Sequence, residues 1–459
     1  MPLTFAPDSA EAWPVLTVDP DAMGVLDTLP APAAAYVRAT GFTGAAGEAV
    51  AYPDAGGAIA GAVLGLGTPV QRARQRFSAI AGVARLPEGT WRLQTGLTGP
   101  ALEELALGWL LHGYVFDRYK AQTPPGARLV APGGVDAARL ELLAAGEALT
   151  RDLINTPASD MGPDALEAAA RDLAAEFGAG VAVIHGGELL ERNLPMIHAV
   201  GRAGAEAPRL IDLTWGASGP ALTLVGKGVC FDTGGLNLKP GASMALMKKD
   251  MGGAATVLGL ARMIMALGLD LRLRVLIPAV ENAVAGNAFR PGDILHSRKG
   301  LTVEINITDA EGRLVLADAL ALADEAGPDH IVSMATLTGA ARVAVGPDLA
   351  PFYTTDDAMA AALARAASDA ADPVWRMPFH DPYETMIEPG IADLDNAPSG
   401  GFAGSITAAL FLRRFVEAAP YTHFDIYGWQ PAPAPARPKG GVGQGARALL
   451  AALPRVLGA

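Results

Sequence analysis

The order of apolar and polar positions predicts an α/β fold for the greater part of the chain. Beyond about residue 155, apolar runs of strand length alternate with segments in which apolar positions recur every three or four residues. The predicted strands lie at residues 181–187, 209–216, 221–231, 271–281, 330–339 and 423–429. The predicted helices between them occupy residues 162–178, 252–267 and 313–327. Continuous apolar strands joined by helices indicate a mixed, largely parallel sheet flanked by helices on both faces.

The first 130 or so residues follow a different pattern. Short apolar runs are mixed with turns rich in glycine and proline, and a helical pattern at residues 101–120 is broken by Pro-Pro-Gly. An amphipathic pattern then predicts a connecting helix. Because 459 residues also exceed one ordinary hydrophobic core, we expect two domains. We predict a smaller N-terminal α/β domain, a linker helix and a larger C-terminal domain at residues 1–134, 135–154 and 155–459.

Composition and charge exclude several classes of protein. Apolar residues make up 51% of the chain, which argues against disorder. The net charge of -13 makes nucleic acid an unlikely partner, because phosphates would be repelled. The single cysteine, Cys230, excludes an intrachain disulfide and any zinc site with several thiolate ligands.

The N-terminal residues do not read as a targeting segment. Acidic residues come early and the first basic side chain is Arg38, the wrong charge pattern for a secretory or mitochondrial leader. The best candidate for a membrane span, residues 251–269, is rich in glycine and alanine and contains Arg262. It fits a buried helix of an α/β core better than a span. We therefore expect a soluble cytoplasmic protein with no membrane partner.

Charged residues interrupt the apolar pattern first at residues 224–240. Lys227 breaks a strand-like run, and the plain alternative is an edge strand whose lysine reaches water. A buried lysine would instead have its pKa lowered and could present a neutral amine. Asp232 is followed by Thr-Gly-Gly, which suits an ordinary turn or a carboxylate brought close to a ligand. The residues alone leave both alternatives open.

Two further segments place charge beside apolar elements. Asp250 stands just before a helix of small residues, so it is either an N-cap or a metal ligand. Asp309, Glu311 and Arg313 recur every second residue, which in an extended segment puts all three on one side. A surface ion-pair ladder would have that spacing, but the flanks are apolar. Buried charges are costly unless they bind something, so this triplet is the strongest single signal.

The carboxylates together suggest a site for divalent metals. Oxygen-rich clusters suit ions such as Mg, Mn or Zn, and two metals that share carboxylates can activate a water molecule. The seven histidines form no H-E-x-x-H pattern, so a thermolysin-like zinc site is absent. The candidate carboxylates are Asp232, Asp250, Asp309 and Glu311.

These segments resemble the leucyl aminopeptidase (cytosol aminopeptidase) family in order and spacing. The matching motifs are VGKGVCFDTGG, Lys239, MKKDMGGAA, TDAEGRL and ATLTGA. Further matches are RDLINTPASDM, FRPGDI and ADLDNAPSGGFAGSITAALFL, so the resemblance covers the C-terminal domain almost throughout. In the N-terminal domain it depends mainly on LGWLLHGYVFDRYK.

The resemblance implies a dinuclear metalloaminopeptidase that removes N-terminal residues from peptides, with a preference for Leu-like residues. A hydroxide that bridges two divalent cations, Mn or Zn, would attack the peptide bond. Lys239 would stabilise the resulting oxyanion, and Arg313 would hold a bicarbonate that relays protons. The metal ligands would be Lys227, Asp232, Asp250, Asp309 and Glu311, with Asp232 and Glu311 shared. The substrate wall would contain Met247 and the segment with Thr336, Leu337 and Gly339.

The resemblance also implies a homohexamer, and it has one departure. The family usually has Asn where this chain has Ile307, and an apolar side chain cannot make the same hydrogen bonds. We expect this change to affect pocket shape and specificity. Two other classes of protein remain as alternatives. A two-metal phosphoesterase is disfavoured by the lysine ligand, and a non-catalytic binding protein is disfavoured by the complete set of candidate residues.

Overall fold

The computed structural model describes residues 3–8 and 11–458 and divides into two compact units. The first unit holds the chain up to Ala148 with two short later segments, Asp369–Ala371 and Pro431–Lys439. The second holds the remainder. Helix α5 (Ala137–Asn155) carries the chain from one unit into the other. The division at residues 134 and 155 stays a prediction.

The N-terminal unit is built on a five-stranded sheet in the order β2-β3-β1-β4-β5. All neighbouring strands are parallel except the pair β2 and β3. Val15, Val18 and Val63 are fully buried in this sheet, so the unit has its own core. The strands are β1 (Trp13–Val18), β2 (Ala49–Pro53), β3 (Ile59–Gly65), β4 (Gly89–Gln94) and β5 (Ala127–Leu129). The helices are η1 (Pro20–Thr28), α1 (Ala31–Ala39), α2 (Pro69–Arg74), α3 (Ile80–Val83) and α4 (Gly99–His112).

Helix α4 is shorter than the apolar pattern at residues 101–120 predicts. It ends at His112, and the backbone N–H of Gly113 donates to Leu110 O at 3.0 Å. Of residues 113–120 only Tyr114 is buried. The helical prediction for this stretch was wrong because the residues after Gly113 have no apolar face to pack.

The second unit contains a nine-stranded sheet in the order β15-β14-β17-β13-β8-β10-β7-β6, with β9 also paired to β10. The central strands β17, β13, β8 and β10 are parallel, whereas β14, β7 and β6 join through antiparallel pairs. The strands of this sheet are β6 (Gly180–His185), β7 (Arg209–Trp215), β8 (Ala221–Gly226), β9 (Gly228–Asp232), β10 (Arg272–Asn282), β13 (His330–Ala335), β14 (Ala350–Thr354), β15 (Val374–Arg376) and β17 (Tyr421–Asp425). The predicted mixed, largely parallel sheet is confirmed.

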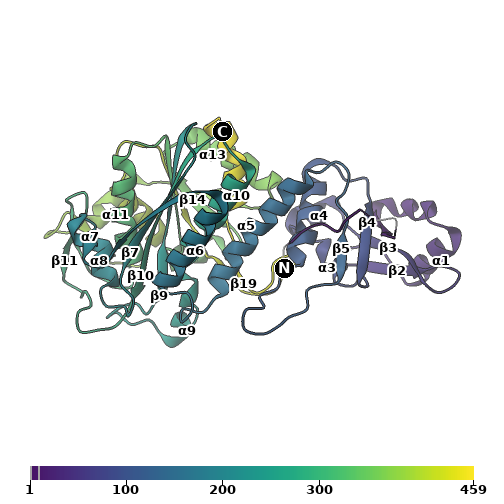
Figure 1. Ribbon diagram of the computed structural model, residues 1–459, viewed down its shortest axis with the longest axis horizontal. Helices are drawn as coiled ribbons and strands as arrows, with labels where there is room; N and C mark the ends of the chain where they lie inside the picture. The colour runs from purple at the N-terminus through teal and green to yellow at the C-terminus, as the bar shows by residue number, and fades with distance from the viewer. Residues whose placement is uncertain (1–2, 9–10, 459) are drawn as a thin grey trace. The chain divides into compact units, whose positions relative to one another are not determined.

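Helices cover both faces of this sheet (Figure 1). One group, α6, α10 and α15, packs together, and the other group consists of α8, α11 and α14. The helices of the unit are α6 (Pro163–Phe177), α7 (Glu188–Glu191), α8 (Pro195–Gly201), α9 (Gly241–Met244), η2 (Met247–Met251), α10 (Gly252–Leu267), α11 (Gly312–Glu325), α12 (Gly339–Val345), α13 (Asp357–Asp369), η3 (Asp381–Ile387), α14 (Gly404–Arg413) and α15 (Ala446–Val456). Two small sheets consist of β11 (Ile294–His296), β12 (Thr302–Glu304) and β16 (Leu394–Asp395), and of β18 (Trp429–Gln430) and β19 (Gly440–Gly441).

The apolar segment Met247–Leu267 is the core helix of this unit. Among the described residues it is long and apolar enough to cross a membrane, with a mean hydropathy of 1.3. However, 83% of its apolar window is buried inside the protein. A helix that is apolar on all sides is typical of a buried core position as well as of a span, and here the segment packs on the sheet and on α6 and α15.

The predicted strand at residues 221–231 is divided in two at Lys227. Strand β8 pairs with β10 and β13, whereas β9 pairs with β10 alone and its register shifts by one residue near Val280. The backbone carbonyl of Lys227 accepts a hydrogen bond from Ala254 N of α10 at 2.9 Å. The chain leaves the regular ladder here, so the Lys227 side chain lies at the carboxyl end of the central strands.

Candidate active site

The carboxyl ends of the parallel strands bring the charged residues together. Lys227 follows β8, Asp232 ends β9, and Asp250 lies in η2 just before α10. Asp309 and Glu311 come from the turn that leads into α11. Ligand sites in open α/β sheets form at this edge, because loops from several strands meet there.

Two lysines bridge the four carboxylates. Lys227 Nζ lies 2.7 Å from Asp250 Oδ2 and 2.9 Å from Glu311 Oε1. Lys239 Nζ lies 2.8 Å from Asp232 Oδ2 and also contacts Asp309 Oδ1. Lys227 is only 3% exposed, so the edge-strand interpretation with a solvated lysine is wrong. Removing such charges from water costs free energy, and this cost is offset only when the charges are paired, as they are here.

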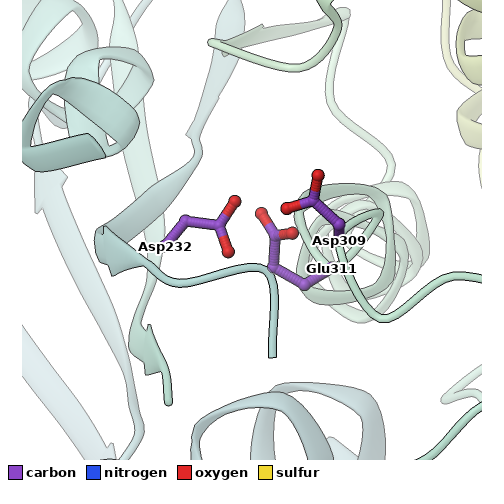
Figure 2. Close-up of side chains that lie close together, drawn as sticks. All are labelled: Asp232, Asp309 and Glu311. Atoms are coloured by element: carbon purple, nitrogen blue, oxygen red, sulfur yellow. The ribbon is translucent and has the colours of Figure 1, made fainter. Parts of the chain in front are cut away.

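The Asp232 carboxylate is held by the turn that follows it and by a residue of β10. Its Oδ1 accepts hydrogen bonds from Gly234 N and from Asn282 Nδ2, both at 2.8 Å. Asn282 ends β10 and also donates to Thr308 O at 3.1 Å. These contacts fix the direction of the Asp232 carboxylate toward Glu311 and Asp309, and Figure 2 shows the three carboxylates pointing toward one another.

The glycines after Asp232 leave room for this arrangement. Gly234 and Gly235 have φ of +88° and +63°, values that side chains with a Cβ rarely adopt. A Cβ on Gly234 would lie 3.0 Å from Asp309 Oδ1, and one on Gly235 would lie 2.9 Å from Thr308 Oγ1. The Thr-Gly-Gly turn therefore brings Asp232 close to the Asp309 segment.

Asp250 is not the N-cap of α10. The N-cap position is Met251, where no side chain caps the helix. The Asp250 Oδ1 atom instead accepts a hydrogen bond from Thr336 Oγ1 at 2.8 Å. Its carboxylate thus joins the cluster at the end of β13.

Burial and mutual repulsion shift the pKa values of the cluster. Burial and the nearby Asp232 raise the pKa of Glu311 to about 7, and burial and Asp250 raise that of Asp232 to about 6. For Lys227, burial acts to lower the pKa, but Asp250 and Glu311 outweigh it and the pKa is raised. The expected lowering for a buried lysine was wrong, because its two carboxylate partners favour the charged amine.

The residues present fit divalent cations. Oxygen atoms of Asp232, Asp309 and Glu311 all lie within 4.8 Å of one another. Within the described part of the chain, the buried Glu311 Oε2 atom has no hydrogen-bond partner. Clustered carboxylates with raised pKa values and an unpaired buried oxygen are the donor set that hard or borderline divalent ions prefer.

A cavity of about 470 Å³ opens beside the cluster. Ten of the eleven residues predicted from the sequence line it: Lys227, Asp232, Lys239, Met247, Asp250, Asp309, Glu311, Thr336, Leu337 and Gly339. The cavity is large enough for an amino-acid side chain and the peptide group next to it.

Arg313 is the predicted residue that does not line the cavity. It lies in α11, so the extended segment assumed for the triplet 309–313 was wrong, because a helix begins at Gly312. Its side chain is buried, with its guanidinium carbon 5.9 Å from the centre of the Phe411 ring. Burial lowers its pKa to about 10. Its Nε and Nη1 atoms have no hydrogen-bond partner among the described residues, as a site for an anion would require.

Ile307 does not line the cavity, and its side chain is 42% exposed. Its backbone carbonyl accepts a hydrogen bond from Asn396 Nδ2 at 2.7 Å. The Ile307 side chain therefore makes no direct contact with the cavity through which it could change the shape of the pocket.

Several residues of the site were missed from the sequence. Lys249, Arg342 and Tyr427 line the cavity, and burial lowers the pKa of Lys249 to about 8. Asp425 accepts hydrogen bonds from the backbone N–H groups of Leu337 and Thr338, at 3.2 and 3.0 Å. The sequence placed Asp425 and Tyr427 inside the predicted strand at residues 423–429. In the structure β17 ends at Asp425, so both residues lie at the strand end, where site residues gather.

The fold and the cluster define a class of two-domain α/β enzyme with a buried carboxylate and lysine centre. Residues 148–450 match the family model described as the cytosol aminopeptidase family, catalytic domain, and residues 14–132 match the M17 aminopeptidase N-terminal domain. The chain belongs to the cytosol aminopeptidase family. It is therefore a peptidase, and the family supports a metal-dependent aminopeptidase that acts on peptides.

Individual relatives agree with this assignment. A probable cytosol aminopeptidase of Syntrophotalea carbinolica is 37% identical over 446 residues, which cover 90% of each chain. The crystal structure of cytosol aminopeptidase from Coxiella burnetii is 42% identical, covers 99% of each chain and has a TM-score of 0.93. The bottromycin maturation enzyme BotP in complex with Mn is 35% identical, covers 97% of this chain and 99% of that one, and has a TM-score of 0.87.

Proposed function

We propose that this protein is a dinuclear metalloaminopeptidase of the leucyl type. The observation that carries the proposal is the cluster of four carboxylates and two lysines that lines one cavity at the carboxyl ends of the parallel strands. The Mn complex of BotP, a relative with the same fold, supports Mn as one of its cations. Zn is the alternative carried by the family resemblance.

The proposed metal ligands divide into two overlapping sets. Lys227, Asp250, Asp232 and Glu311 would hold one cation, and Asp232, Asp309 and Glu311 the other. Lys227 must lose a proton to act as a ligand, so binding of the first cation should release protons. When bound, the two cations would polarise the scissile carbonyl and lower the pKa of a water molecule between them.

Lys239 would supply a positively charged side chain next to the reacting peptide bond. Its side chain lines the cavity and is 13% exposed. Burial acts to lower its pKa, but Asp232 and Glu311 outweigh it, so the group stays charged. We propose that it stabilises the negative oxygen of the tetrahedral intermediate.

Arg313 would hold a bicarbonate that relays protons. Its Nε and Nη1 atoms, which have no hydrogen-bond partner in the described part of the chain, support the binding of a small anion. Because Arg313 itself does not line the cavity, we propose that the anion, rather than the arginine, contacts the substrate. No histidine lines the cavity among the described residues. A bicarbonate held by Arg313 would therefore supply the base that the site lacks.

The substrate wall would consist of Met247 and the segment after β13. Thr336, Leu337 and Gly339 line the cavity, and Asp425 holds the backbone of this segment through Leu337 N. We propose that the wall receives the N-terminal residue and peptide backbone of the substrate, with a preference for Leu-like residues. A homohexamer in the cytoplasm is the further expectation that comes with the family.

Hydrolysis of a panel of aminoacyl-p-nitroanilides tests the proposal. The panel is measured before and after chelation, and again with Mn or Zn restored. We expect metal-dependent release from substrates with a free amino terminus and none from N-acetylated versions. Hydrolysis of p-nitrophenyl phosphate, with no release from any aminoacyl substrate despite bound metal, would favour a phosphoesterase instead.

A further inference from the structure

The charges that line the cavity do not pair off completely. The four carboxylates there are all engaged by two lysines: Asp250 and Glu311 by Lys227, and Asp232 and Asp309 by Lys239. Two further cationic side chains, Lys249 and Arg342, line the same cavity. Within the described residues neither forms an ion pair, although Asp250 attracts Lys249 through space and the cavity holds as many cations as carboxylates.

Lys249 is the more unusual of the two cations. It is 6% exposed and comes directly before Asp250 in η2. Across the described chain its amine makes no hydrogen bond, and its recorded polar contact is with an aromatic ring: Nζ lies 5.0 Å from the centre of the Tyr427 ring. A buried ammonium that no anion contacts directly is costly, so an arrangement that keeps one points to a ligand.

Arg342 lies against the same ring. Its guanidinium carbon is 4.9 Å from the centre of the Tyr427 ring, and its side chain is exposed. Tyr427 follows β17, whereas Lys249 precedes α10 and Arg342 belongs to α12. Three separate elements thus place one buried and one exposed cation around a single aromatic ring at the cavity wall. A cation that contacts a ring face keeps its own charge available to an anion.

We propose that Lys249 and Arg342 form a carboxylate subsite that lets this enzyme accept peptides whose N-terminal residue is acidic. The inference rests on the proposed aminopeptidase function and names a second substrate class beside Leu-like residues. The side-chain carboxylate of Glu or Asp would lie beside Tyr427, with Lys249 at its inner end and Arg342 at the exposed end. Lys249 neighbours the proposed ligand Asp250, so this subsite adjoins the position of the N-terminal residue.

Charge, rather than size, sets the expected discrimination. Glutamate and glutamine have nearly the same shape, so a purely steric pocket treats them alike. A hydrogen bond to a charged group contributes about 1.5–3 kcal/mol, which is about 10- to 150-fold in affinity. We therefore expect kcat/KM for glutamyl-p-nitroanilide to exceed that for glutaminyl-p-nitroanilide by about 10-fold or more.

The test uses the full chain reconstituted with Mn and compares these two substrates in three variants. Lys249→Met removes the buried charge and keeps an unbranched side chain, so the Glu:Gln ratio should fall about 10-fold. Arg342→Met, on the exposed side, should lower the same ratio by a smaller factor. Arg365→Met is the matched control, because Arg365 is also an exposed arginine of a helix but does not line the cavity. It should leave the ratio unchanged.

A ratio near 1 in the unmodified protein overturns the subsite, as does a ratio that neither Lys249→Met nor Arg342→Met alters. Leucyl-glycine and leucyl-glycinamide form a second pair that differs by a C-terminal carboxylate. If Lys249→Met changes that ratio and leaves the Glu:Gln ratio alone, the residue recognises a C-terminus and the proposal is wrong.

Binding separates failure of the subsite from failure of the proposed function. Isothermal titration with L-glutamate and L-glutamine needs no turnover, and glutamate should bind about 10-fold more tightly unless Lys249 is replaced. If no aminoacyl substrate is hydrolysed but this difference persists, the aminopeptidase function fails and the carboxylate site stands. If leucyl-p-nitroanilide is hydrolysed and the difference is absent, the carboxylate site alone fails.

Discussion

A methyl group at position 312 tests whether Lys227 belongs to the metal centre. Gly312 is the first residue of α11 and follows Glu311 directly. An ideal Cβ at this position would lie 2.5 Å from Lys227 Cε and 2.7 Å from Lys227 Nζ. Ordinary van der Waals contact begins at 3.4 Å. In Gly312→Ala the end of the lysine side chain therefore has to move by about 1 Å.

The size of the effect follows from the contacts that this movement breaks. Lys227 Nζ lies 2.7 Å from Asp250 Oδ2 and 2.9 Å from Glu311 Oε1, so a shift of that size takes both pairs out of hydrogen-bond range. Each such charge-assisted bond contributes about 1.5–3 kcal/mol, whereas replacing glycine by alanine in a helix gains about 1 kcal/mol. We expect the free energy of unfolding of the metal-free protein to fall by about 2–5 kcal/mol.

Two measurements check Gly312→Ala. Urea denaturation of the metal-free protein measures stability, and elemental analysis after dialysis against buffered Mn measures bound metal. If Lys227 is a ligand, the variant should keep only the cation held by Asp232, Asp309 and Glu311. Gly187→Ala is the control, because Gly187 has a helical φ of -64° and a Cβ there meets nothing within 4 Å.

The result that refutes the reasoning is a variant with two tightly bound cations per chain and unchanged stability. Lower stability with both cations retained would confirm the clash and reject Lys227 as a ligand. Equal losses in Gly187→Ala would show that the effect does not come from Lys227.

Three further predictions address other parts of the molecule. Lys239→Ala should keep its metal content and lose turnover about 100-fold or more, as when a preorganised donor to an oxyanion is removed; normal turnover would reject its role. Asp232→Ala should lose both cations, because it is the shared ligand, and full occupancy in elemental analysis would reject the two-site assignment. Burial lowers the pKa of His330 to about 4, against the opposing effect of Asp356. The unfolded chain therefore binds a proton near pH 6.5 that the folded protein binds only near 4, so stability should fall as the pH drops through this window. His330→Gln should make that fall shallower in urea denaturation, and equal pH profiles for both proteins would contradict the assignment.

The spacing of apolar residues determined much of the second unit. Helix α10 begins and ends where the sequence predicts, because a largely apolar segment between Asp250 and Gly268 has helical length and a clear stop. The predicted strands at residues 209–216 and 271–281 also correspond to β7 and β10. Local patterning suffices for such elements, because each repeats the period of its own secondary structure.

The candidate site was predictable to the extent that charge stood out against apolar flanks. Lys227, Asp232 and Asp250 each follow or precede a buried element, and the structure places them in one cavity. Asn282, the last residue of β10, directly follows the predicted strand at residues 271–281. It was overlooked because an amide next to a charged Glu281 gives no distinct signal in the sequence. Lys249 and Arg342 were overlooked because a lysine pair and a helical arginine are ordinary surface features.

What the sequence by itself determined is the order of strands and helices and the residues of unusual charge at their ends. Only the tertiary structure decided which of those charges meet. The pKa of Lys227 is raised and not lowered because Asp250 and Glu311, from two other elements, outweigh its burial. Tyr427 lies against Lys249 and Arg342 only because β17 ends beside both. Electrostatic interactions depend on distances through space, and residues far apart in the chain set those distances only when the sheet has formed.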